Sequence, residues 1–280
     1  MKRLLLSIFV VTLSINSIFA QMPPELPFES VPNPLKLPND IHFGEIAGVA
    51  VNSHGHVFVF SRGNSVGPAY MASASQLLEF DAQGNFVREI GKNLNAWSYA
   101  HAVRIDPQDN IWVVDKGSNM ILRFKPEGHV DWVFGRKGEA SHIQVPPDYE
   151  TVMARRFQRM GLDVEIPEEN NPRWPIPIHR DNVFNQPTDV AWDSQGNSYF
   201  SDGYINSRVG KVNARGEWVT SWGSLGSGPG QFDTPHGIAV SPADEIYVAD
   251  RGNRRVQVFN ADGIYIREFV VDVPVDVSRG

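Results

Sequence analysis

The chain has 280 residues, of which 41% are hydrophobic, 11% aromatic and 20% charged, a composition typical of a folded protein with a large core. Its formal net charge of -7 leaves no excess of basic side chains to neutralise phosphates, so we expect no nucleic acid as a partner. It contains no cysteine, so disulfides cannot hold the fold and any metal site must use nitrogen and oxygen ligands.

The first twenty residues have the pattern of a secretory signal peptide. Lys2 and Arg3 precede an apolar run, and small and polar residues follow up to Ala20. A retained N-terminal anchor is the alternative. No later stretch reaches the roughly 20 apolar residues that a membrane-spanning helix needs. We therefore expect residues 1–20 to be removed and the mature protein to be secreted or periplasmic, with no membrane association.

Four segments of the remaining chain share one pattern of alternating apolar residues, a turn, a β-rich run, a second turn and a last strand. Runs such as "IWVVD" and "IYVAD" alternate with a period of two, which predicts strands rather than helices. Four short antiparallel strands in 40 to 50 residues form the blade of a β-propeller, so the predicted fold class is all-β. After an irregular lead-in at residues 21–42, we predict a propeller domain over 43–280, with blades at about 43–91, 97–135, 183–223 and 231–270.

Turns and aromatic residues within the repeats support this prediction. The closing turns "DAQGN", "KPEGH", "NARGE" and "NADGI" each carry a glycine where a hairpin needs a positive φ. Large aromatic side chains in the outer strands are expected to pack between blades, and they include Trp112, Trp132, Trp218 and Trp222.

An insertion at residues 136–182 interrupts the repeats. Its segment "PDYETVMARRFQRMG" has a cap-like Asp148 and helical spacing of apolar residues, which predicts one short helix in a loop. The insertion is either a functional lid or a solvated loop. After the fourth repeat only "VVDVPVDVSRG" remains, so the ring is either four-bladed or part of a larger propeller. We favour the larger propeller, with the chain truncated at its C-terminus.

Equivalent positions at the start of each repeat differ in a way that the scaffold does not require. They hold Ala47, His101, Thr188 and His236, so histidine occurs in alternate blades. Innermost strands of a propeller line its axis, and two such imidazoles would face a common point. They would supply two ligands of a three-histidine zinc site, with the third beyond Gly280. A tolerated repeat residue without function is the alternative.

A second set of positions, at the end of the second strand of each repeat, is mostly basic. It consists of Arg62, Lys116, Gly203 followed by Tyr204, and Arg251. Cations at the mouth of a channel suit an anionic ligand such as a carboxylate, and a phenol beside them could act as a base. Alternatively, the arginines form ion pairs with the aspartates that recur before these turns, or those aspartates cap the turns: Asp115, Asp202 and Asp250.

The segments "PTDVAWDSQGNSYFSDGYINSRV" and "PHGIAVSPADEIYVADRGNRRVQVF" resemble NHL repeats, in particular those of peptidyl-α-hydroxyglycine α-amidating lyases. The resemblance covers roughly residues 43–269 and is most distinctive in "SDGY" and "VADR". It implies a six-bladed propeller, of which this chain holds about four complete blades. It also implies a zinc-dependent lyase that splits a carbinolamide into an amide and glyoxylate.

Carried over residue by residue, the resemblance implies zinc ligands His101 and His236, a base Tyr204, its neighbour Arg251, and Arg62 as a contact to the substrate carboxylate. The family's structural calcium would rest on the backbone carbonyls of Val49 and Val103. The family's disulfides have no counterpart here, and neither does its third histidine. We expect a monomeric enzyme acting on a small molecule or peptide; the alternative is a non-catalytic propeller that binds a partner.

Overall fold

A computed structural model of the protein describes residues 27–63, 75–138, 142–143, 158, 177–178 and 180–271. The chain divides into two units, Met1–Asn33 and Pro34–Gly280, and all the strands lie in the second. The predicted signal peptide and most of the insertion, including its predicted helix, fall outside the described residues. Among the described residues, no helix is long and apolar enough to cross a membrane.

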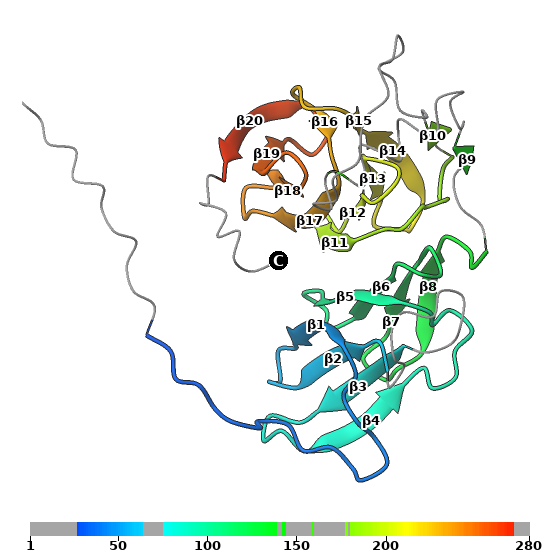
Figure 1. Ribbon diagram of the computed structural model, residues 1–280, viewed down its shortest axis with the longest axis vertical. Helices are drawn as coiled ribbons and strands as arrows, with labels where there is room; N and C mark the ends of the chain where they lie inside the picture. The colour runs from blue at the N-terminus through cyan, green and yellow to red at the C-terminus, as the bar shows by residue number, and fades with distance from the viewer. Residues whose placement is uncertain are drawn as a thin grey trace, which may run out of the picture. The chain divides into compact units, whose positions relative to one another are not determined.

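Four antiparallel four-stranded sheets follow one another along the chain, each with its strands in sequence order (Figure 1). The first sheet consists of β1 (Ile46–Val51), β2 (Val57–Ser61), β3 (Gln76–Phe80) and β4 (Phe86–Ile90). The second consists of β5 (Ala100–Ile105), β6 (Ile111–Asp115), β7 (Met120–Phe124) and β8 (Val130–Phe134). The third sheet consists of β11 (Asp189–Trp192), β12 (Ser198–Asp202), β13 (Arg208–Val212) and β14 (Trp218–Trp222). The fourth consists of β17 (Pro235–Val240), β18 (Ile246–Asp250), β19 (Arg255–Phe259) and β20 (Tyr265–Val270). This repeated meander is the blade of a β-propeller, so the predicted fold class is confirmed.

Two pairs of short strands occur along the chain in the segments that connect these sheets. The antiparallel pair β9 (His142–Ile143) and β10 (Pro177–Ile178) belongs to the insertion, and the parallel pair β15 (Ser224–Leu225) and β16 (Gln231–Phe232) joins the third sheet to the fourth. Residues before the first sheet also pack on it, since Leu35, Leu37, Ile41 and Phe43 contact the cluster of Val59, Leu78 and Phe80.

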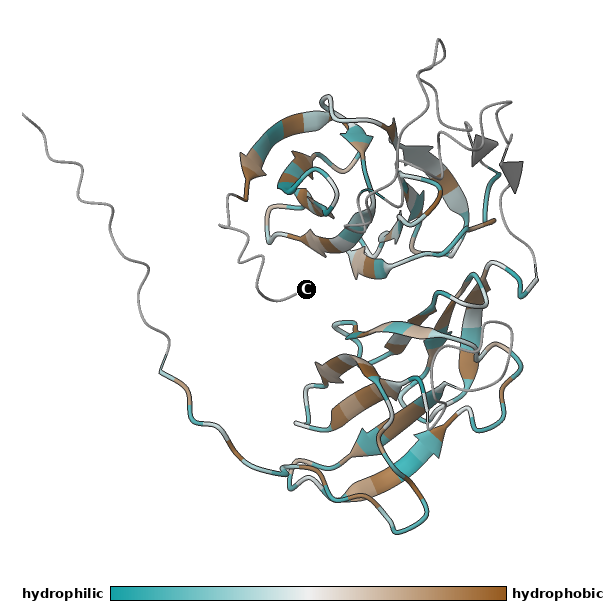
Figure 2. Ribbon diagram, viewed as in Figure 1, coloured by the Kyte–Doolittle hydropathy of each residue, from teal (hydrophilic) through white to brown (hydrophobic). Residues whose placement is uncertain are grey.

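Strands in the middle of the second and third sheets are buried on both faces because a neighbouring sheet covers each face. In β6, Ile111 and Val113 pack against the first sheet, whereas Trp112 and Val114 pack against the third. The same alternation occurs in β12, where Phe200 faces the second sheet and Tyr199 the fourth. Figure 2 shows hydrophobic residues concentrated on the strands. The core therefore consists of layers between consecutive blades, as the period of two permits.

Tryptophans occupy these layers, as predicted, although Trp112 lies in β6, the second strand of its sheet, rather than in an outer strand. Trp112 is 2% exposed, and its ring lies 5.8 Å from that of Trp132 and 6.0 Å from that of Trp192 between the second and third sheets. Trp218 joins the same cluster, and Trp222 packs between the third and fourth sheets.

The closing turns also have the predicted backbone. Gly84, Gly128, Gly216 and Gly263 have φ values of 77°, 97°, 80° and 79°, a region that side-chain-bearing residues adopt at a cost. Each of these glycines sits between the third and fourth strands of its sheet.

Candidate functional site

The histidines of interest lie at irregularities in the innermost strands. Register shifts occur between Ala100 and Ala102 in β5 and between Pro235 and Gly237 in β17, so His101 and His236 are the extra residues of β-bulges. Ala47 takes the same place in β1. A bulge residue is unpaired across the ladder and its side chain is turned away from the regular pleat. The bulge thus explains how the repeat directs these side chains out of the packed layers.

A buried aspartate at the end of the second strand fixes the segment that leads into each of three innermost strands. Asp115 accepts the amide of Ser98 (2.8 Å), Asp202 that of Asn185 (2.9 Å) and Asp250 that of Asp233 (2.7 Å). The spacing is 17 residues in all three repeats. These carboxylates, all 0% exposed, therefore cap turns as one sequence interpretation held, and they hold the chain just before each innermost strand begins.

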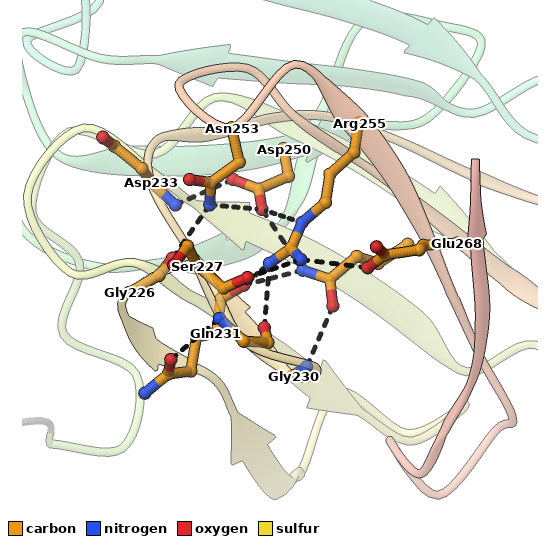
Figure 3. Close-up of polar contacts among 11 residues, drawn as sticks. Gly226, Ser227, Gly230, Gln231, Asp233, Asp250, Asn253, Arg255 and Glu268 are labelled. Atoms are coloured by element: carbon orange, nitrogen blue, oxygen red, sulfur yellow. Dashed lines mark hydrogen bonds and ion pairs between the residues drawn. The ribbon is translucent and has the colours of Figure 1, made fainter. Parts of the chain in front are cut away.

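In the third and fourth sheets, an arginine completes this arrangement, and Figure 3 shows the one of the fourth sheet. Arg255 donates to Asp250 (2.8 Å), to Glu268 (2.9 Å) and to the carbonyl of Gln231 (2.8 Å). Arg208 forms the corresponding buried pair with Asp202, at 3.0 Å. Among the described residues, the recurring aspartates thus bind backbone amides, neutral side chains and, in two sheets, other arginines. This corrects the alternative in which Arg62 and Arg251 pair with them.

Two imidazoles and one phenol meet at the site. The rings of His101 and His236 lie 4.8 Å apart between centroids, and Nε2 of each contacts the hydroxyl of Tyr204, at 3.4 Å and 3.1 Å. Nδ1 of His101 lies 2.6 Å from the carbonyl oxygen of Thr188. A carbonyl only accepts, so Nδ1 carries the proton and Nε2 of the neutral ring has a free lone pair. The hydroxyl has one proton and can donate to one imidazole at a time.

Both imidazoles are held in the neutral form. Burial lowers the pKa of His101 to about 3, with further lowering by His236 and by the cations Lys116 and Arg62. Burial also lowers the pKa of His236 to about 4, followed by the charges of Arg251 and Lys116. Neutral imidazoles are the form that binds a metal ion.

Gly203 brings the phenol to this point. A side chain on Gly203 would collide with the backbone carbonyl of Pro235, so only glycine permits this approach. The next residue is Tyr204, and the residue after Pro235 is His236. Close contact of the two backbones therefore places the hydroxyl beside the imidazole.

The predicted cations surround the site at different distances. Lys116 is 8% exposed, and its ammonium lies 3.5 Å from the centroid of the Tyr204 ring. Arg62 binds the carboxylate of Glu45, donates to the carbonyl of Ala100 (3.0 Å) and lies over the ring of Tyr99 (3.9 Å). Arg251 is exposed, and its backbone amide donates to the carbonyl of Thr234 (3.2 Å). The structure thus brings together His101, His236, Tyr204 and Lys116, with the two arginines at the edge.

The two imidazoles would suit a zinc ion as part of its ligand set. Their nitrogen donors converge, and the bond from His101 to a carbonyl is the outer-shell contact usual for a zinc-binding histidine. Zinc takes at least three protein ligands, and no group of three His, Cys, Asp or Glu side chains in the described part of the chain could hold a metal together. His101 and His236 therefore account for two ligands of such a site.

The predicted calcium site involves adjacent innermost strands, β1 and β5. The carbonyl of Val103 accepts a bond from Arg104 at 3.2 Å, and the same guanidinium pairs with Asp189 at 2.8 Å. A cation thus already faces one of the two carbonyls, and calcium takes six to eight oxygen ligands. Val49 and Val103 as calcium ligands stay a prediction.

Several residues around the site were not predicted from the sequence. Thr188 was identified only as the residue equivalent to the histidines, and its carbonyl orients one of them. Tyr99 and Glu45 were missed, although Tyr99 lies only two residues before His101. No local sequence pattern distinguishes them, because their contacts depend on the packing of one blade on the next.

The fold and the site define the class of the protein, a β-propeller whose innermost strands present imidazoles beside a phenol that follows the second strand of the third sheet. The family model of the NHL repeat matches residues 232–259, from β16 to β19 of this structure. Streptogramin B lyase, a solved structure, shares the fold with a TM-score of 0.52 at 13% identity, over 83% of this chain and 57% of that one. At this identity the similarity concerns the fold alone.

More specific similarity comes from relatives in sequence. The chain is 30% identical over 251 residues to peptidylglycine alpha-amidating monooxygenase of Rattus norvegicus, covering 82% of this chain and 22% of that protein. It is 26% identical over 226 residues to NHL repeat-containing protein 3 of Mus musculus, covering 76% of this chain and 51% of that protein. It is 24% identical over 245 residues to peptidyl-alpha-hydroxyglycine alpha-amidating lyase 1 of Drosophila melanogaster, covering 79% of this chain and 38% of that protein. The resemblance inferred from the repeats is confirmed, although the chain spans only part of each relative.

Proposed function

We propose that the protein is a zinc-dependent carbon–nitrogen lyase that cleaves a carbinolamide of the peptidyl-α-hydroxyglycine type into an amide and glyoxylate. The convergence of two neutral imidazoles on the hydroxyl of Tyr204 is the observation that carries this proposal. The similarity to an amidating lyase of Drosophila melanogaster supports the choice of reaction. Zinc, bound by His101, His236 and a further ligand, would polarise the substrate hydroxyl as a Lewis acid.

The residues of this chain would then divide the proton transfers among them. Tyr204, in its phenolate form, would take the proton of the substrate hydroxyl, the oxygen would form the carbonyl of glyoxylate, and the C–N bond would break. The departing amide nitrogen takes a proton back from the phenol, so that atoms and charge balance. Arg62 would bind the substrate carboxylate, and Arg251 would stabilise charge near the phenol.

Zinc content tests the metal part of this proposal. We expect the purified protein to hold stoichiometric zinc and His101→Ala and His236→Ala to lose it. His129→Ala, at an exposed turn histidine, is the matched control and should retain the metal. A folded wild-type protein without zinc would overturn the proposal.

Glyoxylate release from a peptide ending in α-hydroxyglycine tests the reaction. We expect Tyr204→Phe to retain zinc and to lose about two orders of magnitude or more in kcat, because general-base contributions are typically of this size. Unchanged turnover in Tyr204→Phe would exclude the phenol as the base.

The alternative is a non-catalytic propeller that binds a small molecule, a peptide or another partner through its loops. The similarity to NHL repeat-containing protein 3, whose name records only the repeat, is compatible with this alternative. A folded protein that has neither zinc nor lyase activity would support it.

The remaining expectations concern the mature protein. We propose that it is exported after cleavage near Gln21, on the basis of the N-terminal residue pattern, and that it is monomeric. Amino-terminal sequencing of the exported protein and its mass in solution would test both statements.

A further inference from the structure

Cations and aromatic rings alternate in a row that crosses three sheets. Arg62, just after β2, lies 3.9 Å from the centroid of the Tyr99 ring. Lys116, just after β6, lies 5.2 Å from the same ring and 3.5 Å from the ring of Tyr204, which follows β12. The row ends where the hydroxyl of Tyr204 meets His236 of the fourth sheet. It thus connects the charged rim to the centre of the site.

Lys116 is the member of this row that is both buried and backbone-fixed. Its amide donates to the carbonyl of Tyr99 (2.9 Å), and the preceding residue is the buried Asp115, which accepts the amide of Tyr99 (2.9 Å). An ammonium group excluded from water gains more from an aromatic face than an exposed one does. The short distance to Tyr204 therefore represents a directed contact.

We propose that Lys116 is a positioning residue, whose ammonium on the face of the Tyr204 ring keeps the phenol hydroxyl within reach of both imidazoles. A cation on the ring face opposes rotation of the side chain about Cα–Cβ, which would carry the hydroxyl away from His101 and His236. The role of Lys116 in turnover rests on the proposed lyase function. Its role in holding the ring does not, and it can be measured without any substrate or metal.

The first test follows the Tyr204 ring directly. The chain has seven tyrosines, so protein labelled with 3-fluorotyrosine carries seven fluorinated rings. The resonance that is missing from the spectrum of Tyr204→Phe is that of Tyr204. We expect that resonance to be a single narrow line in the wild type, to shift and broaden or split in Lys116→Met, and to be restored in Lys116→Arg. Lys92→Met, at a side chain that is 69% exposed, is the control and should leave the line unchanged. An unchanged line in Lys116→Met would overturn the proposal.

The second test keeps the proposal falsifiable if Lys116→Met does not fold. In wild-type protein labelled with isotopic lysine, the ε-methylene protons of Lys116 should be shifted upfield by the ring current of Tyr204. The shift should persist in Tyr204→Phe and fall in Tyr204→Leu to the smaller part caused by the more distant ring of Tyr99. A Lys116 signal at the position of exposed lysines in the wild type would contradict the contact.

Kinetics then separate this role from the lyase proposal. If the lyase function holds, Lys116→Met should retain zinc and lower kcat about tenfold with little change in KM, and Lys116→Arg should recover most of the loss. If the protein has no lyase activity, the fluorine spectra still decide whether Lys116 positions the ring. A change in KM alone would assign Lys116 to substrate binding and contradict the positioning role.

Discussion

The imidazole of His101 donates from Nδ1 to the backbone carbonyl of Thr188, 2.6 Å away, although the two residues are 87 positions apart in the chain. The contact runs from the second sheet to the third. It selects the tautomer of the histidine, since the carbonyl can only accept. Residues that fix the backbone of Thr188 should therefore influence the histidine as well.

The hydroxyl of Thr188 provides such a constraint. Its Oγ1 lies 2.7 Å from Oγ of Ser201 and 3.0 Å from the carbonyl of Pro235 in the fourth sheet. We expect Thr188→Val to lower the free energy of unfolding by about 1 to 3 kcal/mol, because buried polar partners lose a hydrogen bond. Thr188→Ser retains the hydroxyl and is the control. Urea unfolding checks the prediction, and equal midpoints for valine and threonine would contradict it.

Breaking the buried pair of Arg255 and Asp250 should be more costly. Arg255→Met would leave a carboxylate that is 0% exposed without its cation, and such losses amount to about 3 to 5 kcal/mol. We expect a large drop in the free energy of unfolding, measured in urea. Arg215→Met removes an exposed ion pair with Glu217 and should leave stability unchanged. Similar stabilities for the two variants would show that burial does not decide the effect.

Asp189 should make stability depend on pH in a defined direction. Burial raises the pKa of this carboxyl above 3.8, although the nearby Arg104 opposes the shift. The carboxyl of Asp189 then loses its proton more readily in the unfolded chain than in the folded one. Its protonated form therefore stabilises the folded state fully at pH values below the pKa of the unfolded chain, and this contribution is lost as the pH rises through the pKa of the folded state. Relative to wild type, Asp189→Asn should become more stable as pH rises from about 3.5 to 7. Urea unfolding of both proteins across this range tests it, and a constant difference would contradict it.

Arg104 and calcium should compete for the carbonyl of Val103. The guanidinium donates to this oxygen, and two cations cannot share it without repulsion. We expect added Ca²⁺ to raise the Tm of chelator-treated Arg104→Met by more than it raises that of the wild type. Mg²⁺ serves as the control ion, and equal shifts in the two proteins would exclude competition at this carbonyl.

Much of the architecture could be predicted because it depends on local pattern. Alternation with a period of two and glycines in the closing turns are visible in the chain, and they predict four four-stranded sheets. Comparison of the repeats likewise identified His101, His236 and Tyr204 as residues that the scaffold does not require. Their roles in catalysis stay predictions.

Other features depend on contacts between blades and could not be predicted. Successive side chains of the run "IWVVD" face the first and the third sheet in turn, rather than core and solvent. The period of two is the same in both cases, so the sequence pattern cannot distinguish them. The placement of Lys116 over Tyr204 depends on the stacking of the second sheet against the third. The bonds of Arg62 to Glu45 and to the carbonyl of Ala100 likewise require the folded arrangement.

The bulges in the innermost strands have a consequence for protein engineering and for evolution. A residue that is unpaired across the ladder can change identity without altering the strand pairing around it. Side chains at these positions can therefore be exchanged one blade at a time, while the folding of the repeat is largely preserved. Ala47, at the same position of β1, is accordingly a site where a new functional side chain can be introduced without redesigning the sheet.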